Sequence, residues 1–168
     1  MSAKTDLKNF FTKLKRATRQ AQSKPQLKSL ALEAIRLITV RTRLGYGVEK
    51  PLGQRSKLRP LSPNYINFRS KSSKLSSMTT AKRSNLTFTG QLIDSLDIIT
   101  SKSGGVTIGP KGRRSDGESN ANIAKFQAEQ GRVFMNLSRL EFQQLLRFYR
   151  RQFGDLYRNE RLTFHQQR

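Results

Sequence analysis

Residues 96–109 read LDIITSKSGGVTIG. Apolar and β-branched residues stand on both sides of a Ser-Gly-Gly turn at 103–105, and glycine turns of this kind connect antiparallel strands. The segment therefore predicts a β-hairpin, with strands over 98–100 and 106–108. We expect the helices of the chain to pack around this hairpin.

Helical signals precede the hairpin. Pro25 suits the first turn of a helix, an apolar stripe runs from Leu27 to Ile38, and two glycines after residue 44 end the pattern. Residues 44–62 are predicted to form a loop. Ser62 followed by Pro63 predicts a capped short helix over 63–70, which would present Tyr65, Ile66 and Phe68.

The segment from 86 onward has a globular pattern. Residues 86–88 suggest a short β-like run, and Thr89 is expected to cap a helix through residue 96. After a polar loop over 110–119, Asn120 is expected to cap a second helix, which Gly131 would end. The inward side chains of that helix are predicted to be Ile123, Ala124 and Phe126.

The last predicted helix follows an extended segment over 132–135. Ser138 and Glu141 have the spacing of a capping box, in which each side chain bonds the other residue's backbone N–H. Apolar residues then recur on one face and Gly154 ends the pattern; the face consists of Phe142, Leu145, Leu146, Tyr149 and Phe153.

The charge is high and unevenly distributed. The 168 residues include 33 Lys and Arg against 11 Asp and Glu, a formal net charge of +22. Residues 1–83 carry 20 of the basic residues and 3 of the acidic ones, and residues 84–168 carry 13 and 8. A surface of this charge attracts polyanions.

We divide the chain by this charge pattern into four parts. They are a basic N-terminal helix or arm (1–24), a helix plus a basic Ser/Lys-rich loop or arm (25–84), a globular core (85–154) and a basic C-terminal tail (155–168). The predicted fold class is α+β. It comprises a small antiparallel sheet, formed by the hairpin plus extra strands, packed with several amphipathic helices and preceded by a long basic extension.

The composition argues against several kinds of chemistry. The chain has no Cys and a single His, His165, which excludes thiol catalysis and Cys-ligated metals and disfavours a Ser-His-Asp relay. We therefore expect no catalytic residue, no metal site and no cofactor. No apolar run approaches the ~18 residues of a membrane span, and no membrane partner is expected. An enzyme acting on nucleic acid is the least favoured hypothesis, and its candidate groups are Asp94, Asp97, Asp116 and Glu118.

Two basic segments are candidate contact regions. Residues 5–22 predict an amphipathic helix, whose apolar residues Leu7, Phe10, Phe11 and Leu14 are candidates for docking to a partner. The basic face of this helix has three possible surroundings: solvent, a membrane surface or nucleic acid. Its residues include Lys13, Lys15, Arg16 and Arg19.

Residues 70–84 contain eight Ser and Thr among fifteen residues. They form either a flexible linker or an arm that orders on a neighbouring subunit or on phosphates. The candidate contacts to DNA or to acidic partners are Lys13, Lys15, Arg16 and Arg19 of the first segment, Lys71 and Lys74 of this one, and Arg113 and Arg114 in the polar loop.

The order of several short motifs resembles a known family. LTFTGQL at 86–92, VTIG at 106–109, IAKF at 123–126 and RVFMNLS at 132–138 follow one another as in the virion morphogenesis proteins of tailed bacteriophages. RTRL at 41–44 resembles that family's Arg-Thr-Gly stretch, with Arg43 where Gly is usual. The family contains tail-completion, neck and head–tail joining proteins.

The resemblance implies a non-catalytic structural protein of the virion neck or tail, assembled in the host cytoplasm. It implies a ring of copies around a duplex DNA that is contacted without sequence preference, and we expect six copies. Further partners would be connector or adaptor proteins and tail-tube or tail-terminator proteins. The alternative, from composition, is a basic protein that binds RNA or DNA non-specifically, of a ribosome-associated or nucleoid type.

Overall fold

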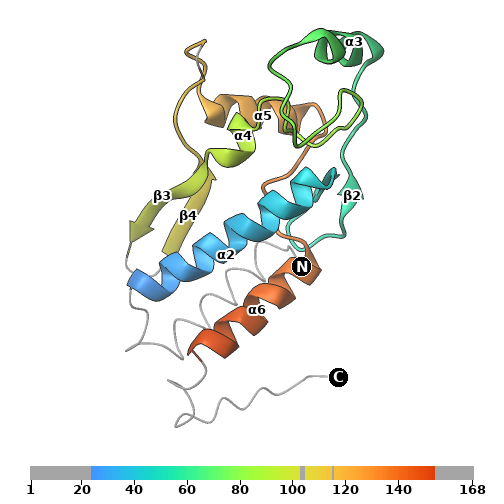
Figure 1. Ribbon diagram of the computed structural model, residues 1–168. Helices are drawn as coiled ribbons and strands as arrows, with labels where there is room; N and C mark the ends of the chain where they lie inside the picture. The colour runs from blue at the N-terminus through green and yellow to red at the C-terminus, as the bar shows by residue number, and fades with distance from the viewer. Residues whose placement is uncertain (1–23, 103–104, 115, 154–168) are drawn as a thin grey trace.

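The structure, a computed structural model, describes residues 24–102, 105–114 and 116–153. Figure 1 labels its elements, in chain order: α2 (Lys24–Arg43), β1 (Tyr46–Gly47), β2 (Ser56–Lys57), α3 (Pro63–Lys71), α4 (Gln91–Asp94), β3 (Leu96–Lys102), β4 (Gly105–Pro110), α5 (Asn120–Glu129) and α6 (Arg139–Phe153). The fold is α+β, as the sequence predicts. The helix expected over 5–22 and the tail over 155–168 lie outside the described residues.

The helix α2 begins and ends where the sequence predicts. Pro25 lies in its first turn, and Gly45 follows it with φ of 88°, a conformation that glycine adopts without strain. The buried apolar side chains of α2 recur on one face: Leu27, Ala31, Ala34, Leu37 and Ile38. This face crosses the hairpin, and α2 also contacts α6 (Figure 1).

The hydrophobic core forms where α2 lies on the hairpin. Strands β3 and β4 pair antiparallel, with a bulge between Ile98 and Thr100. The buried core residues come from α2, α4, β3, α5 and the segment before α6: Ile38, Leu92, Ile93, Leu96, Ala124 and Phe134. One core therefore joins α2 to the segments after residue 86.

The extra strands do not extend the hairpin. β1 pairs with β2, so the described residues form two separate two-stranded sheets. The prediction of a plain loop over 44–62 missed this pair, because two-residue strands are too short to show a hydrophobic period. The backbone N–H of Val48 donates to the carbonyl of Val133 at 3.0 Å, which ties this sheet to the segment before α6.

Two predictions around residue 88 are wrong. Residues 86–88 are not a strand, because Leu86 has φ of 56° and turns the chain out of the extended conformation. The helix α4 is one turn long and starts after Gly90, whose φ is 81°. The Thr89 hydroxyl accepts only a long hydrogen bond, 3.4 Å, from the N–H of Gln91.

The prediction for α5 needs two corrections. Ser119, not Asn120, is the N-cap, and its Oγ accepts from the N–H of Asn122 at 3.1 Å. Asn120 is buried and donates to the carbonyl of Lys111 at 2.6 Å, which holds the start of α5 against the exit of β4. Phe126 does not point inward, since 55% of it is exposed. The predicted stop is confirmed by Gly131, with φ of 75°.

The capping box before α6 is confirmed. The N–H of Ser138 donates to Oε2 of Glu141 at 2.8 Å, and the N–H of Glu141 donates to Oγ of Ser138 at 3.2 Å. The predicted apolar face of α6 is half-buried along its length. The helix α6 therefore begins where the capping box predicts, directly after Ser138.

Gly47 occupies a position in which no side chain fits. A β-carbon there would collide with the backbone carbonyl of Val133 and lie 2.8 Å from Cδ2 of Leu58. Because that carbonyl is held by Val48, it cannot move aside without breaking a hydrogen bond. We expect Gly47→Ala to lower the free energy of unfolding by about 1–3 kcal/mol, measured by urea denaturation. A variant as stable as the parent would show that the contact relaxes freely.

Candidate nucleic-acid interface

A long stretch of the chain carries positive charge with no acid to balance it. Between Glu49 and Asp94 the sequence has nine basic residues and no Asp or Glu. In the structure, residues 59–88 of this stretch fold into a lobe that contains α3 (Figure 1). From here on, the arm means this lobe, residues 59–88. Asn85 joins the arm to the end of α2 by donating to the carbonyl of Arg43 at 3.2 Å.

Arg69 holds the arm together. Its side chain is buried, with 2% exposed, and its guanidinium donates to the carbonyls of Arg83 at 3.0 Å and Thr80 at 3.1 Å. The same group lies 5.9 Å from the ring centre of Tyr65 and 5.6 Å from that of Phe88. Burial lowers the pKa of Arg69. The Ser/Thr-rich segment is therefore wrapped around an internal cation rather than extended as a linker.

We expect Arg69→Lys to loosen the arm while the core stays folded. An ammonium cannot reproduce the planar fork that reaches two carbonyls, so buried acceptors lose their partners, at about 1–3 kcal/mol of local stability. Hydrogen exchange at the N–H groups of Ser76, Thr79 and Arg83 should accelerate. Arg59→Lys, at an exposed side chain, is the matched control. Unchanged exchange in the arm of Arg69→Lys would contradict this role.

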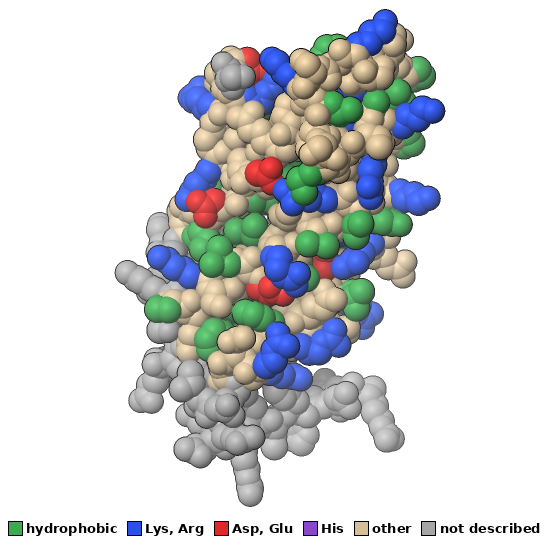
Figure 2. Space-filling view, viewed as in Figure 1, with side chains coloured by type: hydrophobic (Ala, Val, Ile, Leu, Met, Phe, Trp, Pro, Cys, Tyr) green, Lys and Arg blue, Asp and Glu red, His purple; other side chains and the backbone are tan. Residues whose placement is uncertain are grey.

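The outer surface of the arm is cationic. Two predicted contact residues, Lys71 and Lys74, are exposed there, and the structure adds Lys82 and Arg83 to them. Within the part of the chain that the structure describes, none of the four has an acidic partner. Figure 2 shows Lys and Arg side chains projecting from this end of the molecule, at the upper right. Hydroxyl and cationic groups of this kind suit phosphate oxygens.

The other two predicted contacts, Arg113 and Arg114, lie outside the arm, in the loop between β4 and α5. Arg114 forms an ion pair with Asp116, and Arg113 donates to the carbonyl of Gly117 at 3.0 Å. In the same loop Lys111 pairs with Asp97 at 2.7 Å. Local acids therefore neutralise much of this loop, which sets it apart from the arm.

The remaining predicted contacts lie outside the described residues. They are the basic residues Lys13, Lys15, Arg16 and Arg19 and the docking residues Leu7, Phe10, Phe11 and Leu14.

Comparisons with protein-family models, with curated proteins and with solved structures found no match.

A buried ion pair that sequence reasoning missed joins the end of α2 to the start of α6. Arg41, 1% exposed, donates to Oε2 of Glu141 at 2.6 Å and to the carbonyls of Asn136, at 2.8 Å, and Phe134. Arg55 approaches the other carboxylate oxygen of Glu141 to 3.4 Å. Burial lowers the pKa of Arg41, and the charge of Glu141 opposes that shift. Arg41 thus connects the end of α2 to the start of α6 and is not available to a ligand.

The four carboxylates considered for catalysis each have a local partner. Asp94 pairs with Arg43, Asp97 with Lys111 and Asp116 with Arg114. Glu118 accepts from the side-chain amide of Asn122 at 2.8 Å. The hydrogen bond from Lys111 lowers the pKa of Asp97. Three of these carboxylates therefore lie in separate ion pairs and the fourth is bonded to an amide.

The described residues offer neither a metal site nor a membrane span. No group of three or more His, Asp or Glu among them could hold a metal ion. No helix within the described ranges has both the length and the apolar character needed to cross a bilayer.

Proposed function

We propose that this chain is a structural subunit of the neck or tail of a tailed bacteriophage. As a tail-completion or head–tail joining protein, it would form a ring of copies around duplex DNA and bind connector and tail proteins on either side. The observation that carries the proposal is the arm, whose charge no acid balances among the described residues. The order of motifs over 86–138 supports the virion setting.

Duplex DNA suits the arm as a partner because its charge is opposite to that of the arm. Duplex DNA carries one negative charge per ~1.7 Å of axis, and a cationic surface binds it by releasing condensed counterions. A set of arms facing a channel would hold or guide such a polyanion without reading its bases. Arg69 supports this because it keeps the arm folded from the inside and leaves Lys71 and Lys74 free to point outward.

The ring is supported by apolar side chains exposed on two different elements. Leu32 and Val40 on α2 and Leu44 directly after it are spaced by eight and four residues, and they are each about half exposed, at 57%, 48% and 54%. On the arm, Phe68 and Met78 are exposed to 57% and 56%. A ring needs two unlike surfaces on each copy, and these two patches would serve as such.

Negative-stain electron microscopy of the purified full chain tests the proposal. We expect closed rings of one diameter, with rotational symmetry that distinguishes six copies from twelve. Val40→Asp should prevent ring closure because it places a charge in an apolar contact, whereas Lys28→Asp, at an exposed position on the same helix, is the control. A monomer that binds RNA in a salt-sensitive manner and forms no ring with or without DNA would favour the nucleic-acid-binding alternative.

A further inference from the structure

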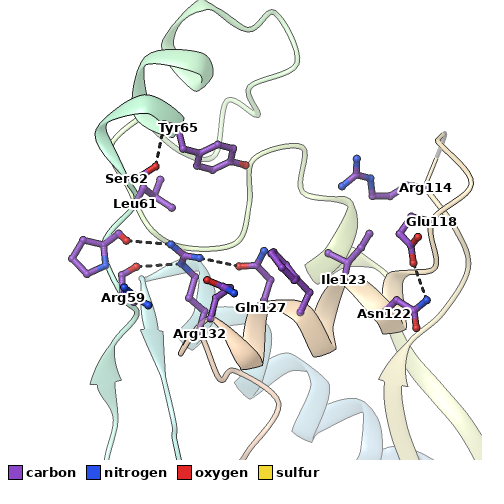
Figure 3. Close-up of a pocket in the computed structure, with 13 residues that line it drawn as sticks. Arg59, Leu61, Ser62, Tyr65, Arg114, Glu118, Asn122, Ile123, Gln127 and Arg132 are labelled. Atoms are coloured by element: carbon purple, nitrogen blue, oxygen red, sulfur yellow. Dashed lines mark hydrogen bonds between the residues drawn. The ribbon is translucent and has the colours of Figure 1, made fainter.

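A hollow lies between the arm and α5. Its volume is about 790 Å³, within the ~300–1,000 Å³ range of ligand pockets. Figure 3 shows Leu61 and Tyr65 on the arm side and Gln127 on the α5 side, with Arg132 at one end and Glu118 at the other. We call this hollow the groove.

One end of the groove presents two cations without a counter-ion. The guanidinium of Arg132 donates to the carbonyls of Arg59 at 3.3 Å and Pro60 at 3.1 Å, and to Oε1 of Gln127 at 3.4 Å. All three acceptors are neutral. Arg59 adds a second charge nearby, and burial together with that charge lowers the pKa of Arg132. Neither guanidinium has a carboxylate partner within the described ranges.

The rest of the groove is mixed in character. Phe126 is 55% exposed and Tyr65 39% exposed, although large aromatic side chains usually lose such exposure on folding. Side-chain amides of Gln127 and Gln130 line the same hollow. Glu118 stands at the end away from Arg132, beside Arg114, whose guanidinium pairs with Asp116 (Figure 3). The groove thus offers cations, aromatic surface, amides and one carboxylate.

We propose that the groove binds an acidic, aromatic-containing peptide segment of a partner protein. A carboxylate of the segment pairs with Arg59 and Arg132, as guanidinium forks favour, and an apolar side chain packs on Phe126 and Tyr65. Peptide N–H and C=O groups match the amides of the walls, which both donate and accept.

The charge pattern favours a peptide over nucleic acid. A DNA duplex is too wide to enter a hollow of this size and would touch only its rim. Because Arg114 is already paired with Asp116, the carboxylate of Glu118 repels phosphates at that end, whereas a peptide can place a backbone N–H or a basic side chain beside it. This inference does not depend on ring formation, because the groove is built within one subunit.

Fluorescence anisotropy with defined probes tests the groove. The probes are a labelled hexapeptide of alternating Glu and Phe, its Gln/Phe counterpart, and a labelled 12-nucleotide single-stranded DNA, each added to the full chain at physiological salt. We expect the Glu/Phe peptide to bind at least about tenfold more tightly than the Gln/Phe peptide. Because the whole chain is cationic, the decisive comparison is between variants.

Arg59→Gln and Phe126→Ser should each weaken Glu/Phe peptide binding by about tenfold. Lys125 lies next to Phe126 on α5 but does not line the groove. Lys125→Gln therefore removes one charge outside the groove, and it should change binding by less than about twofold. Equal losses in Arg59→Gln and Lys125→Gln would overturn the proposal, since they would indicate attraction to net charge alone. Absence of peptide binding would overturn it as well. So would oligonucleotide binding that depends on Arg59 and Phe126.

Discussion

Glu141→Gln is expected to lower the free energy of unfolding by about 3–5 kcal/mol. The substitution keeps the shape of the side chain and its ability to accept a hydrogen bond from Ser138, but it removes the negative charge. Arg41, 1% exposed, then remains as an uncompensated charge inside the protein. A loss of this size is a large part of the ~5–15 kcal/mol that stabilises a typical domain.

Urea denaturation followed by circular dichroism measures this loss. Glu33→Gln is the matched control, because Glu33 also pairs with an arginine, but one whose side chain is 59% exposed on α2, Arg36. Exposed pairs three residues apart in a helix contribute only about 0.2–0.5 kcal/mol. If Glu141→Gln cost no more than Glu33→Gln, the buried ion pair would not be what holds α2 to α6.

Removing the charge of the arm should abolish most of the affinity for duplex DNA. Each phosphate contact contributes about 0.9 to the slope of log affinity against log salt concentration. A variant with Lys71, Lys74, Lys82 and Arg83 changed to Gln is therefore expected to lower that slope by about 3 to 4. The effect should be equal for duplexes of unrelated sequence, because phosphate contacts carry no base information.

The control variant changes four basic residues outside the arm: Lys111, Arg113, Arg114 and Lys125. It removes the same number of charges, but two of them are already paired, with Asp97 and Asp116. We expect it to lower the slope by about 1 or less. Titration of both variants with a short duplex at several salt concentrations makes the comparison. Equal slopes for the two would mean that net charge, not the arm, sets DNA affinity.

Local signals in the sequence predicted the regular elements well. The helix α2, the β3–β4 hairpin and the capping box of α6 each depend on residues close together in the chain. So does the N-cap of α3, where Oγ of Ser62 accepts from the N–H of Tyr65 at 3.3 Å. Where the prediction was wrong, a distant contact or an unusual backbone angle decided the outcome. Leu86 turns the chain with a positive φ that leucine rarely adopts, and Phe126 lies at the groove rather than in the core.

The candidate interface was predicted only in part. Composition indicated Lys71 and Lys74, but it could not show that Arg114 is paired with Asp116 two residues away. Composition also could not reveal the role of Arg69, because its closest acceptors are backbone carbonyl groups, which every residue has. The pair of Arg41 and Glu141 spans 100 residues, and no local pattern in the sequence connects the two.

Electron cryomicroscopy of the full chain mixed with a short duplex tests the central claim most directly. The account predicts a ring of identical subunits in which the arm of each copy faces a rod of DNA density on the axis. Lys71 and Lys74 would then lie within reach of the phosphates. Solitary subunits, or a ring whose arms turn away from its centre and leave the channel lined by other segments, would contradict it.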